Sequence, residues 1–265
     1  MPIFEKHKII HVKIVSYNLN GFRAAIKKGF IDWVAQENID VICLQEIKAT
    51  QDVVDVKLLE DLGYEHHWYS AQKKGYSGVA IFSKHEATEI KFGTGHEMSD
   101  FEGRVIQAKI KDLIIISAYF PSGTAGDIRQ TYKYQWLAEF EDHVEQLKAC
   151  HQDIVICGDY NIAHTAIDIH DPKSNKNTTG FLPQERDWLT NFFAKGWIDS
   201  FRHINKEPHH YTWWSQRFPS VRLNNKGWRI DYISVSESLA SKIKDAGMVP
   251  DARHSDHCPI FVEIK

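Results

Sequence analysis

Polar side chains that could bind a cation or transfer a proton stand at the ends of several apolar segments. Asp159 and Asn161 follow the run Ile154–Cys157, and Glu46 follows the run Val41–Leu44. A carboxylate beside a buried strand is costly unless it binds a metal ion or meets a hydrogen-bond donor. Further side chains of this kind flank other apolar runs: Asn18, Asp231, Asp256 and His257. The pattern predicts a site for a hard cation with a histidine beside it.

Glu46 is the strongest candidate for a metal ligand. A lone Glu at a strand end is usually exposed or acts as a cap, but Glu46 follows a fully apolar segment where water would be scarce. Mg²⁺ takes one or two carboxylates and completes its shell with water and substrate phosphate. Asn18, Asn20 and Asp256 could supply the remaining oxygens, and no Cys or His spacing resembles a zinc site. We therefore predict Mg²⁺, with Mn²⁺ as a substitute.

Asp159 and Asn161 lie two residues apart, so in an extended segment both side chains face the same way. One could hold an attacking water while the amide of the other donates to a phosphate oxygen. The alternative is an Asx-turn that closes the strand, because Asp and Asn are common turn residues.

His257 has a similar ambiguity, since an isolated histidine is most often structural. Its neighbour Asp256 would point to the opposite face of an extended segment, so we do not expect these two side chains to pair. Asp231, from another strand, is the better partner. A hydrogen bond from one imidazole nitrogen to Asp231 would fix the tautomer and favour imidazolium, which can neutralise charge on a pentavalent phosphate.

The length of 265 residues allows one large α/β domain or two small ones, and an apolar fraction of 43% suffices for a full core. The cysteines lie far apart with no Cys-x-x-Cys pair, mostly in apolar segments, which predicts reduced and buried thiols: Cys43, Cys150, Cys157 and Cys258. The N-terminal segment contains Glu5 and no apolar stretch of secretory length, and no run approaches membrane-spanning length. We expect a cytoplasmic protein without membrane contact.

The net charge of −3 argues mildly against nucleic-acid binding by bulk charge alone, but it does not exclude DNA. An acidic metal cluster can coexist with local basic groups. The candidates for such groups are Arg23, Lys27, Lys28, Lys73, Lys74, Arg217, Arg222, Lys226 and Arg229. The alternative is that most of them are solvated surface charges.

Short β-branched runs alternate with amphipathic helical stretches. The predicted strands are His11–Tyr17, Val41–Leu44, Val79–Ser83, Val105–Ile110, Leu113–Tyr119, Ile154–Cys157, Tyr232–Val235 and Pro259–Ile264. Apolar stripes at helical spacing predict three helices, over residues 22–34, 136–147 and 188–193. Two strands that follow each other at once, at 105–110 and 113–119, require a hairpin, which excludes a purely parallel sheet.

No repeat or linker divides the chain, and Thr165–Thr179 is polar enough to be a long surface loop. We therefore predict one α/β domain, residues 1–265, of two packed mixed β-sheets flanked by helices.

Nine sequence blocks resemble the exonuclease III family of apurinic/apyrimidinic (AP) endonucleases, within the endonuclease/exonuclease/phosphatase superfamily. They appear in the family's order and span essentially the whole chain: Asn18–Ala24, Leu44–Lys48, Gly75–Ala80, Glu102–Val105, Tyr119–Pro121, Gly158–Asn161, Gly180–Arg186, Gly227–Tyr232 and Ser255–Pro259. The resemblance implies a four-layer sandwich with these motifs at one rim. It also implies Mg²⁺-dependent cleavage of duplex DNA on the 5′ side of abasic sites, with 3′–5′ exonuclease and 3′-phosphodiesterase activities, by a monomer that also accepts blocked 3′ ends.

The resemblance assigns roles to further residues. Asp231 and His257 match the family's Asp–His pair, and Tyr119 matches a tyrosine that points at the scissile phosphate. Whether Tyr119 or Asp159 activates the water stays open. Residues matching the substrate-binding positions are Arg23, Lys28 and Lys48 near the DNA backbone, Tyr76, and Trp213, Trp228 and Ile230.

The last three match an apolar pocket for a flipped-out, base-less sugar, where a nucleotide that keeps its base would clash. The alternative is that these aromatic residues fill the core, which we expect of Trp214.

The loop Ser122–Asp127 departs from relatives that carry a large polar or basic wedge at this position. Grip on the duplex would then be weaker or would come from Arg217 or Arg222. Two other functions remain. The same metal-dependent fold could act on a phospholipid or inositol phosphate, although the blocks at Gly180–Arg186 and Gly227–Tyr232 argue against this. The chain could also be a DNA-binding relative without catalysis, but such a relative would be expected to have lost some of the residues Glu46, Asp159, Asn161, Asp231 and His257, which are all present here.

Overall fold

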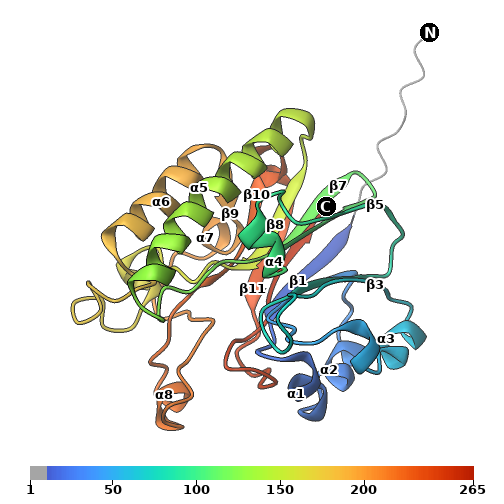
Figure 1. Cartoon of the computed structure of the whole chain (residues 1–265), viewed down its shortest axis with the longest axis horizontal. Helices are drawn as coiled ribbons and strands as arrows, with labels where there is room; N and C mark the ends of the chain where they lie inside the picture. Colours follow the sequence, from blue (N-terminus) through green and yellow to red (C-terminus); the bar gives the residue numbers. More distant parts are fainter. Residues whose placement is uncertain (1–10) are drawn as a thin grey trace.

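Two six-stranded sheets, described for residues 11–265 in a computed structural model, form the centre of the molecule (Figure 1). The first sheet has the strand order β11 (Ile243–Met248), β12 (Ile260–Ile264), β1 (Val12–Asn18), β2 (Val41–Gln45), β4 (Val79–Ser83) and β3 (Glu65–Tyr69). The second has the order β5 (Ala87–Phe92), β6 (Val105–Ile110), β7 (Leu113–Tyr119), β8 (Ile154–Asp159), β10 (Asp231–Ser236) and β9 (Trp197–Asp199).

Both sheets are mixed, as predicted. The central pairs β1–β2 and β7–β8 are parallel, and the other neighbours are antiparallel, including the predicted hairpin β6–β7. Each of the eight predicted strands is present. The strands that sequence reasoning missed in the described part are β3, β5, β9 and β11, which are the edges of the two sheets. Edge strands are half exposed or short, so they lack the continuous apolar run that marks a central strand.

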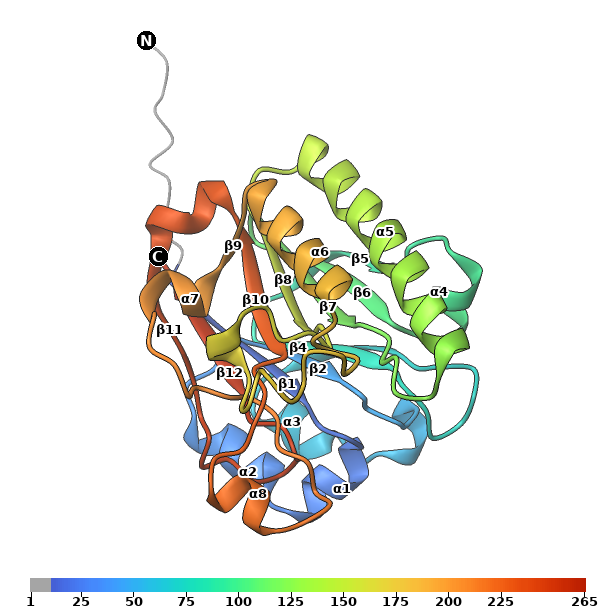
Figure 2. The ribbon, with the colours of Figure 1, turned by 90° about the vertical axis from the view of Figure 1, so that its left-hand side faces the viewer.

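Helices cover the outer face of each sheet, which completes the predicted four-layer sandwich (Figures 1 and 2). On the first sheet lie α1 (Phe22–Lys27), α2 (Phe30–Gln36) and α3 (Lys57–Asp61), and on the second lie α5 (Asp127–Cys150) and α6 (Pro183–Ala194). Shorter elements fill the connections: η1 (Gln51–Val53), α4 (Glu97–Phe101), η2 (Ala166–Asp168), α7 (Ser200–Ile204), α8 (Ser220–Leu223) and η3 (Glu237–Lys242).

Three apolar layers result from the alternation of side chains along the strands. In β1, Ile14 packs between the two sheets while Val15 packs against the helices of the first sheet. In β8, Val155 lies between the sheets while Ile156 packs beneath α5 and α6. Burying one such side chain contributes about 1.5–3 kcal/mol, so the three layers fix the strand ends relative to each other.

Two predictions about elements need correction. The helix predicted over residues 22–34 is divided into α1 and α2, because Gly29 adopts a left-handed conformation with φ 87° that ends the first helix. The polar stretch Thr165–Thr179 is not only a surface loop. It contains η2, and the Asp168 side chain is buried against two arginines.

The four cysteines are free thiols, and only Cys150, at the end of α5, is exposed. Within residues 11–265, none of the helices combines the length and the apolar character needed to cross a membrane. Glu5 lies outside the described residues.

Candidate active site

The topology brings the predicted catalytic residues to one end of the sandwich. Asn18 and Asp159 are the last residues of β1 and β8, and Glu46 directly follows β2. Because β10 runs antiparallel to β8, its first residue, Asp231, pairs with Asp159. His257 precedes β12, the antiparallel neighbour of β1. Residues from five strands of both sheets therefore meet at one place.

Three of these residues could hold a metal ion together. Glu46, Asp159 and His257 each present a ligand atom, and these atoms lie within 4.8 Å of one another. The Asn18 amide joins two of them, since Nδ2 donates to Glu46 Oε1 at 3.0 Å and to Asp159 Oδ2 at 2.8 Å. Lys48 Nζ lies 2.7 Å from the other Glu46 oxygen. This strand-end cluster is the centre of the candidate site.

His257 pairs with Asp231, as predicted. Its Nδ1 lies 2.9 Å from Asp231 Oδ2, and its Nε2 lies 3.9 Å from Asp159 Oδ2. Burial alone would lower the pKa of His257, but the Asp231 carboxylate, aided by Asp159 and Asp256, raises it to about 10. Without a bound metal the ring is therefore an imidazolium at neutral pH, which can stabilise negative charge.

Asp256 points away from the ring of its neighbour, as the alternation of an extended segment requires. It accepts hydrogen bonds from Asn20 Nδ2 at 3.0 Å and from Trp213 Nε1 at 3.1 Å. The Asn20 oxygen in turn accepts from Lys48 Nζ at 2.5 Å. Asn18 and Asn20, predicted as oxygen ligands, thus use their amide nitrogens to orient Glu46, Asp159 and Asp256.

Among the carboxylates of the cluster, Asp159 has a pKa that is raised into the neutral range. Burial raises its pKa to about 8, with the Asp231 and Glu46 charges adding to the effect and His257 opposing it. Asn161 donates to it twice, from the backbone nitrogen at 2.9 Å and from Nδ2 at 3.3 Å. Burial would also raise the pKa of Glu46, but Lys48 and Asn18 together lower it. Glu46 is thus ionised at neutral pH, whereas Asp159 can gain or lose a proton near that pH.

Tyr119 keeps its proton at neutral pH and is therefore poorly suited to act as a base. Burial, together with the Glu46 and Asp159 charges, raises the pKa of its phenol well above 10. Arg104, fully buried, lies over its ring at 4.8 Å and donates to its carbonyl oxygen at 2.7 Å. Of the two residues proposed to activate water, Asp159 therefore loses a proton more readily.

The loops that carry these residues adopt backbone conformations that non-glycine residues rarely use. The φ angles are 47° at Asn20, 48° at Glu46, 49° at Lys48 and 53° at Asn161. The loops that follow β1 and β2 are joined by backbone hydrogen bonds, including Gly21 N to Glu46 O at 2.8 Å. Such conformations cluster at functional sites because the surrounding structure must impose them.

A cavity of about 360 Å³ opens beside the cluster and brings together the predicted catalytic and specificity residues. Its lining includes the polar residues Glu46, Asp159 and His257 together with the apolar residues Trp213, Trp228 and Ile230, which we call the apolar wall. The two indoles stand perpendicular, with ring centroids 6.1 Å apart. The remaining lining residues are Tyr119, Ser122, Thr124, Asn161, Thr178, Thr179, Gly180 and Asp256. Trp214 is buried in a separate apolar cluster, as expected of a core residue.

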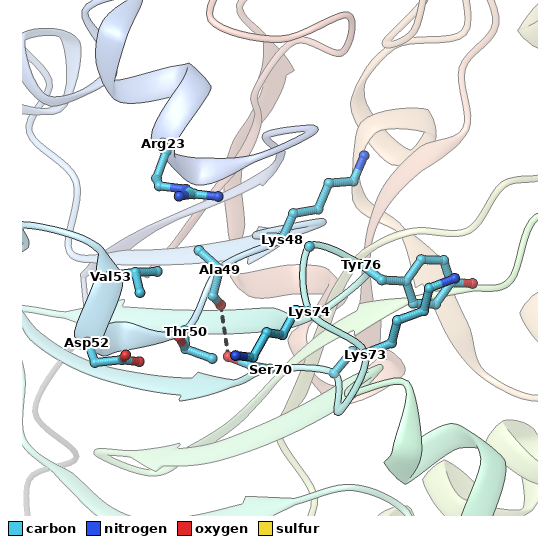
Figure 3. A pocket seen from close by; sticks show the side chains of 12 residues that line it. Arg23, Lys48, Ala49, Thr50, Asp52, Val53, Ser70, Lys73, Lys74 and Tyr76 are labelled. Atoms are coloured by element: carbon cyan, nitrogen blue, oxygen red, sulfur yellow. Dashed lines mark hydrogen bonds between the residues drawn. The ribbon is translucent and has the colours of Figure 1, made fainter.

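A second, basic cavity of about 440 Å³ lies next to the cluster (Figure 3). Arg23 enters it from α1, and Lys73 and Lys74 come from the loop between β3 and β4. Lys48 lines it too, while its ammonium group reaches Glu46. Lys27 lines an adjoining hollow with Arg23 and Lys48. We call these residues the basic rim: Arg23, Lys27, Lys48, Lys73 and Lys74.

Most of the basic rim carries free charge. Across residues 11–265, no carboxylate lies within ion-pair distance of Arg23, Lys27, Lys73 or Lys74. Tyr76 lines the same cavity and accepts hydrogen bonds from Arg104 and Arg129 through its hydroxyl. The predicted residue Lys28 caps α1 and lines neither hollow.

Two arginines considered for DNA contact have other partners. Arg229 is fully buried and forms ion pairs with Asp168 and Asp199, so it holds the start of β10. Arg222 donates to the carbonyl oxygens of Ser255 and Ala252 and packs over Trp214. Sequence alone could not separate them from surface charges, because their acidic and carbonyl partners are distant along the chain.

Sequence reasoning also missed a buried ion pair behind the cavity. Lys133 Nζ lies 2.6 Å from Glu185 Oε1, and both side chains are completely buried. A signal for Lys133 was present, since it shares a helical face with Trp136, Phe140 and Val144. A lysine on such an apolar face requires a buried acceptor.

Comparison with known proteins identifies relatives over most of the chain. The model of the "Endonuclease/Exonuclease/phosphatase family" matches residues 15–257. An exodeoxyribonuclease from Bacillus subtilis is 41% identical over 251 residues, which cover 94% of this chain and 98% of that protein. A DNA repair nuclease from Danio rerio is 38% identical and is matched over 94% of this chain and 81% of its own length.

Solved structures agree in fold. A 3′ phosphatase from Neisseria, bound to a product DNA hairpin, superposes with a TM-score of 0.89 at 29% identity, covering 96% of this chain and 99% of that one. An AP endonuclease from Archaeoglobus fulgidus gives a TM-score of 0.87 at 28% identity, with the same coverage. The chain therefore belongs to the endonuclease/exonuclease/phosphatase family, and within it to the exonuclease III type that its sequence blocks predicted.

Proposed function

We propose that this chain is a Mg²⁺-dependent DNA repair nuclease that cleaves duplex DNA on the 5′ side of an abasic site and leaves a 3′-hydroxyl. As a monomer, it also removes blocking groups from 3′ ends and degrades strands in the 3′ to 5′ direction. The proposal rests mainly on one observation. The Asp159, Asn161 and His257 side chains face the same cavity as the apolar wall of Trp213, Trp228 and Ile230.

The donor set fits a hard cation. Two of the three groups at the cluster, Glu46 and Asp159, offer carboxylate oxygens, which Mg²⁺ prefers. Glu46 and Asp256 would hold the ion, with Asn18 and Asn20 beside them. When bound, Mg²⁺ neutralises negative charge on the phosphate and on the departing oxygen.

The chain's own groups account for the remaining chemistry. The ionised form of Asp159 accepts a proton from the attacking water, and the water oxygen bonds to phosphorus. The bond from phosphorus to the 3′ oxygen breaks, and that oxygen takes a proton from the solvent to become the 3′-hydroxyl, while Asp159 returns its proton to the solvent. His257, kept charged by Asp231, neutralises the charge that develops on the phosphate oxygens, and the Asn161 amide stabilises that charge by a hydrogen bond. Tyr119, which keeps its proton, donates to the same group.

The two cavities suggest how the duplex is held. The unpaired cations of the basic rim would bind phosphates of the flanking strand. The aromatic wall would receive the base-less sugar once it leaves the stack. The loop after Tyr119 contributes only the short side chains Ser122 and Thr124 to the cavity, so most of the grip comes from the rim.

Product analysis on three duplexes tests the proposal: one with an abasic site, one with a 3′-phosphate and one undamaged and blunt-ended. We expect Mg²⁺-dependent nicking of the abasic duplex to a 3′ end that a polymerase extends, release of the 3′-phosphate, and slow digestion of the blunt duplex. EDTA and Asp159→Asn should abolish all three. Binding without nicking would indicate a catalytically inactive relative, and hydrolysis of inositol phosphates in place of DNA would indicate a different phosphodiesterase.

A further inference from the structure

A buried ion pair behind the catalytic cavity joins two helices to the loops that form its wall. Lys133 lies on α5 and Glu185 in the first turn of α6, and neither side chain is exposed. Besides its 2.6 Å contact with Glu185, Lys133 Nζ donates to the backbone oxygen of Asn161 at 2.8 Å. Neither charged group lines the cavity, so neither contacts a substrate there.

Through its other oxygen, Glu185 binds the adjacent loop. Its Oε2 accepts from the backbone nitrogens of Gly180 at 2.6 Å and Leu182 at 3.0 Å. Its Oε1 also accepts from the Thr179 hydroxyl at 3.3 Å. Glu185 Oε1 accepts from Gln130 Nε2 at 3.2 Å as well. The pair therefore contacts the carbonyl of Asn161, the hydroxyl of Thr179 and the backbone nitrogens of Gly180 and Leu182, which belong to two adjacent loops.

Both segments need this restraint because their conformations are uncommon and closely fitted. Asn161 has φ 53°, and Gly180 has φ 88°. A Cβ atom on Gly180 would lie 3.0 Å from the Trp228 ring and 3.1 Å from the Asn161 oxygen. A small shift of the loop would therefore move the Trp228 indole and the Asn161 side chain, both of which line the cavity.

Stability alone does not explain the pair. Replacing a buried ion pair by apolar residues of similar volume is often neutral or stabilising, because desolvation offsets the attraction. The surrounding α5–α6 contact is already apolar, with Leu137, Phe140, Leu189 and Phe192 in one cluster. An apolar pair could fill the same space, but it would offer nothing to the Asn161 carbonyl or to the Gly180 and Leu182 amides.

We propose that Lys133 and Glu185 are positioning residues that align Asn161 and the wall at Thr179–Gly180, and that they thereby set both the rate and the preference for a base-less sugar. This inference rests on the proposed function, because Lys133 and Glu185 would position residues of the active site proposed above.

The test compares Lys133→Met, Lys133→Arg and Val144→Ala. Met approximates the length of Lys without its charge, Arg restores a cationic donor, and Val144 is a buried residue of the same helix outside the cavity. For each protein we would measure kcat and KM on an abasic duplex, the ratio of cleavage at abasic and intact sites, the melting temperature, and amide exchange at Gly180 and Leu182.

We expect Lys133→Met to lose roughly tenfold or more in kcat with little change in KM, to show a lower abasic-to-intact ratio, and to exchange both amides faster. Lys133→Arg should recover part of each loss. Val144→Ala should lose stability through its cavity yet keep the wild-type kcat and ratio.

A folded Lys133→Met protein with the wild-type kcat and ratio would overturn the proposal, as would an equal loss of ratio in Val144→Ala. If Lys133→Met does not fold, Glu185→Gln, which keeps the volume, decides by the same readouts. A wild-type protein that fails to nick the abasic duplex would instead refute the proposed function.

Discussion

Four carboxylates lie around His257, and each has different hydrogen-bond or ion-pair partners. Glu46 is paired with Lys48, Asp231 with the imidazole, and Asp256 with Asn20 and Trp213. Asp159 is left with amide donors and a pKa raised by burial to about 8. Divergent environments of this kind are how neighbouring acids come to serve as ligand, base and orienting group.

Glu46→Gln should weaken the use of Mg²⁺, because a neutral amide replaces a charged ligand in a site with few carboxylates. Activity on the abasic duplex should fall at low Mg²⁺ and recover partly as Mg²⁺ rises. The measurement is a Mg²⁺ titration of the nicking rate, with Glu89→Gln on the exposed edge strand β5 as the control. A Glu46→Gln protein with the wild-type Mg²⁺ dependence would remove Glu46 from the metal site.

Asp159→Asn and His257→Asn should each reduce kcat by about a hundredfold or more, the range for a general base or a charge stabiliser. Binding of abasic DNA should survive both changes, because the basic rim is untouched. Asp231→Ala should show a milder form of the His257 defect.

The double variant Asp231→Ala/His257→Ala tests whether these two residues act as a unit. Its rate should match that of His257→Ala alone. A loss equal to the product of the two single losses would mean that the residues act independently, despite their 2.9 Å contact.

At the scale of elements, the sequence carried most of the information for central strands and little for edges. A run such as Val79–Ser83 is wholly buried and reads as a strand, whereas β5 is largely exposed and has no such pattern. The sequence predicted a site at the strand ends, because polar motifs directly follow apolar runs. It did not predict that the Asn18 amide bridges Glu46 and Asp159. That contact joins residues 141 positions apart and depends on how the two sheets pack.

The basic rim should make DNA binding sensitive to salt in spite of the net charge of −3. Each phosphate that is neutralised contributes about −0.9 to the slope of log K against log salt. Arg23→Ala on α1 should reduce the magnitude of that slope by roughly one unit. Lys244→Ala serves as the control, because Lys244 lies on β11 and is already paired with Glu263. An unchanged slope for Arg23→Ala would place this residue away from the DNA backbone.

At the scale of the whole molecule, His257 and Asp159 lie where the two sheets meet, and their protonation should make the free energy of unfolding depend on pH. In metal-free protein, His257 has a pKa of about 10 when folded against 6.5 unfolded, and Asp159 about 8 against 3.8. The folded state binds both protons more tightly. The stabilisation linked to His257 is therefore complete below pH 6.5 and is lost as pH rises towards 10.

Urea unfolding in EDTA at pH 6.5, 8 and 10 measures this linkage, because these pH values span the interval between the unfolded and folded pKa of His257. The wild-type protein should lose up to a few kcal/mol more than His257→Asn over this interval. Equal losses in the two proteins would show that His257 titrates alike in the folded and unfolded states, and the imidazolium assignment would be wrong.

Selection of a base-less sugar by the apolar wall is the central claim, and Trp228→Ala tests it most directly. The quantity to measure is the ratio of cleavage rates at abasic and intact sites in the same duplex, with a thermal melt to verify folding. Trp33→Ala, which removes an indole from α2 outside the cavity, is the matched control. We predict slower cleavage at abasic sites and a lower ratio for Trp228→Ala, because the stacking surface is lost and the clash with a base is relieved. A folded Trp228→Ala protein with the wild-type ratio would contradict the account, because the wall would then have no part in substrate choice.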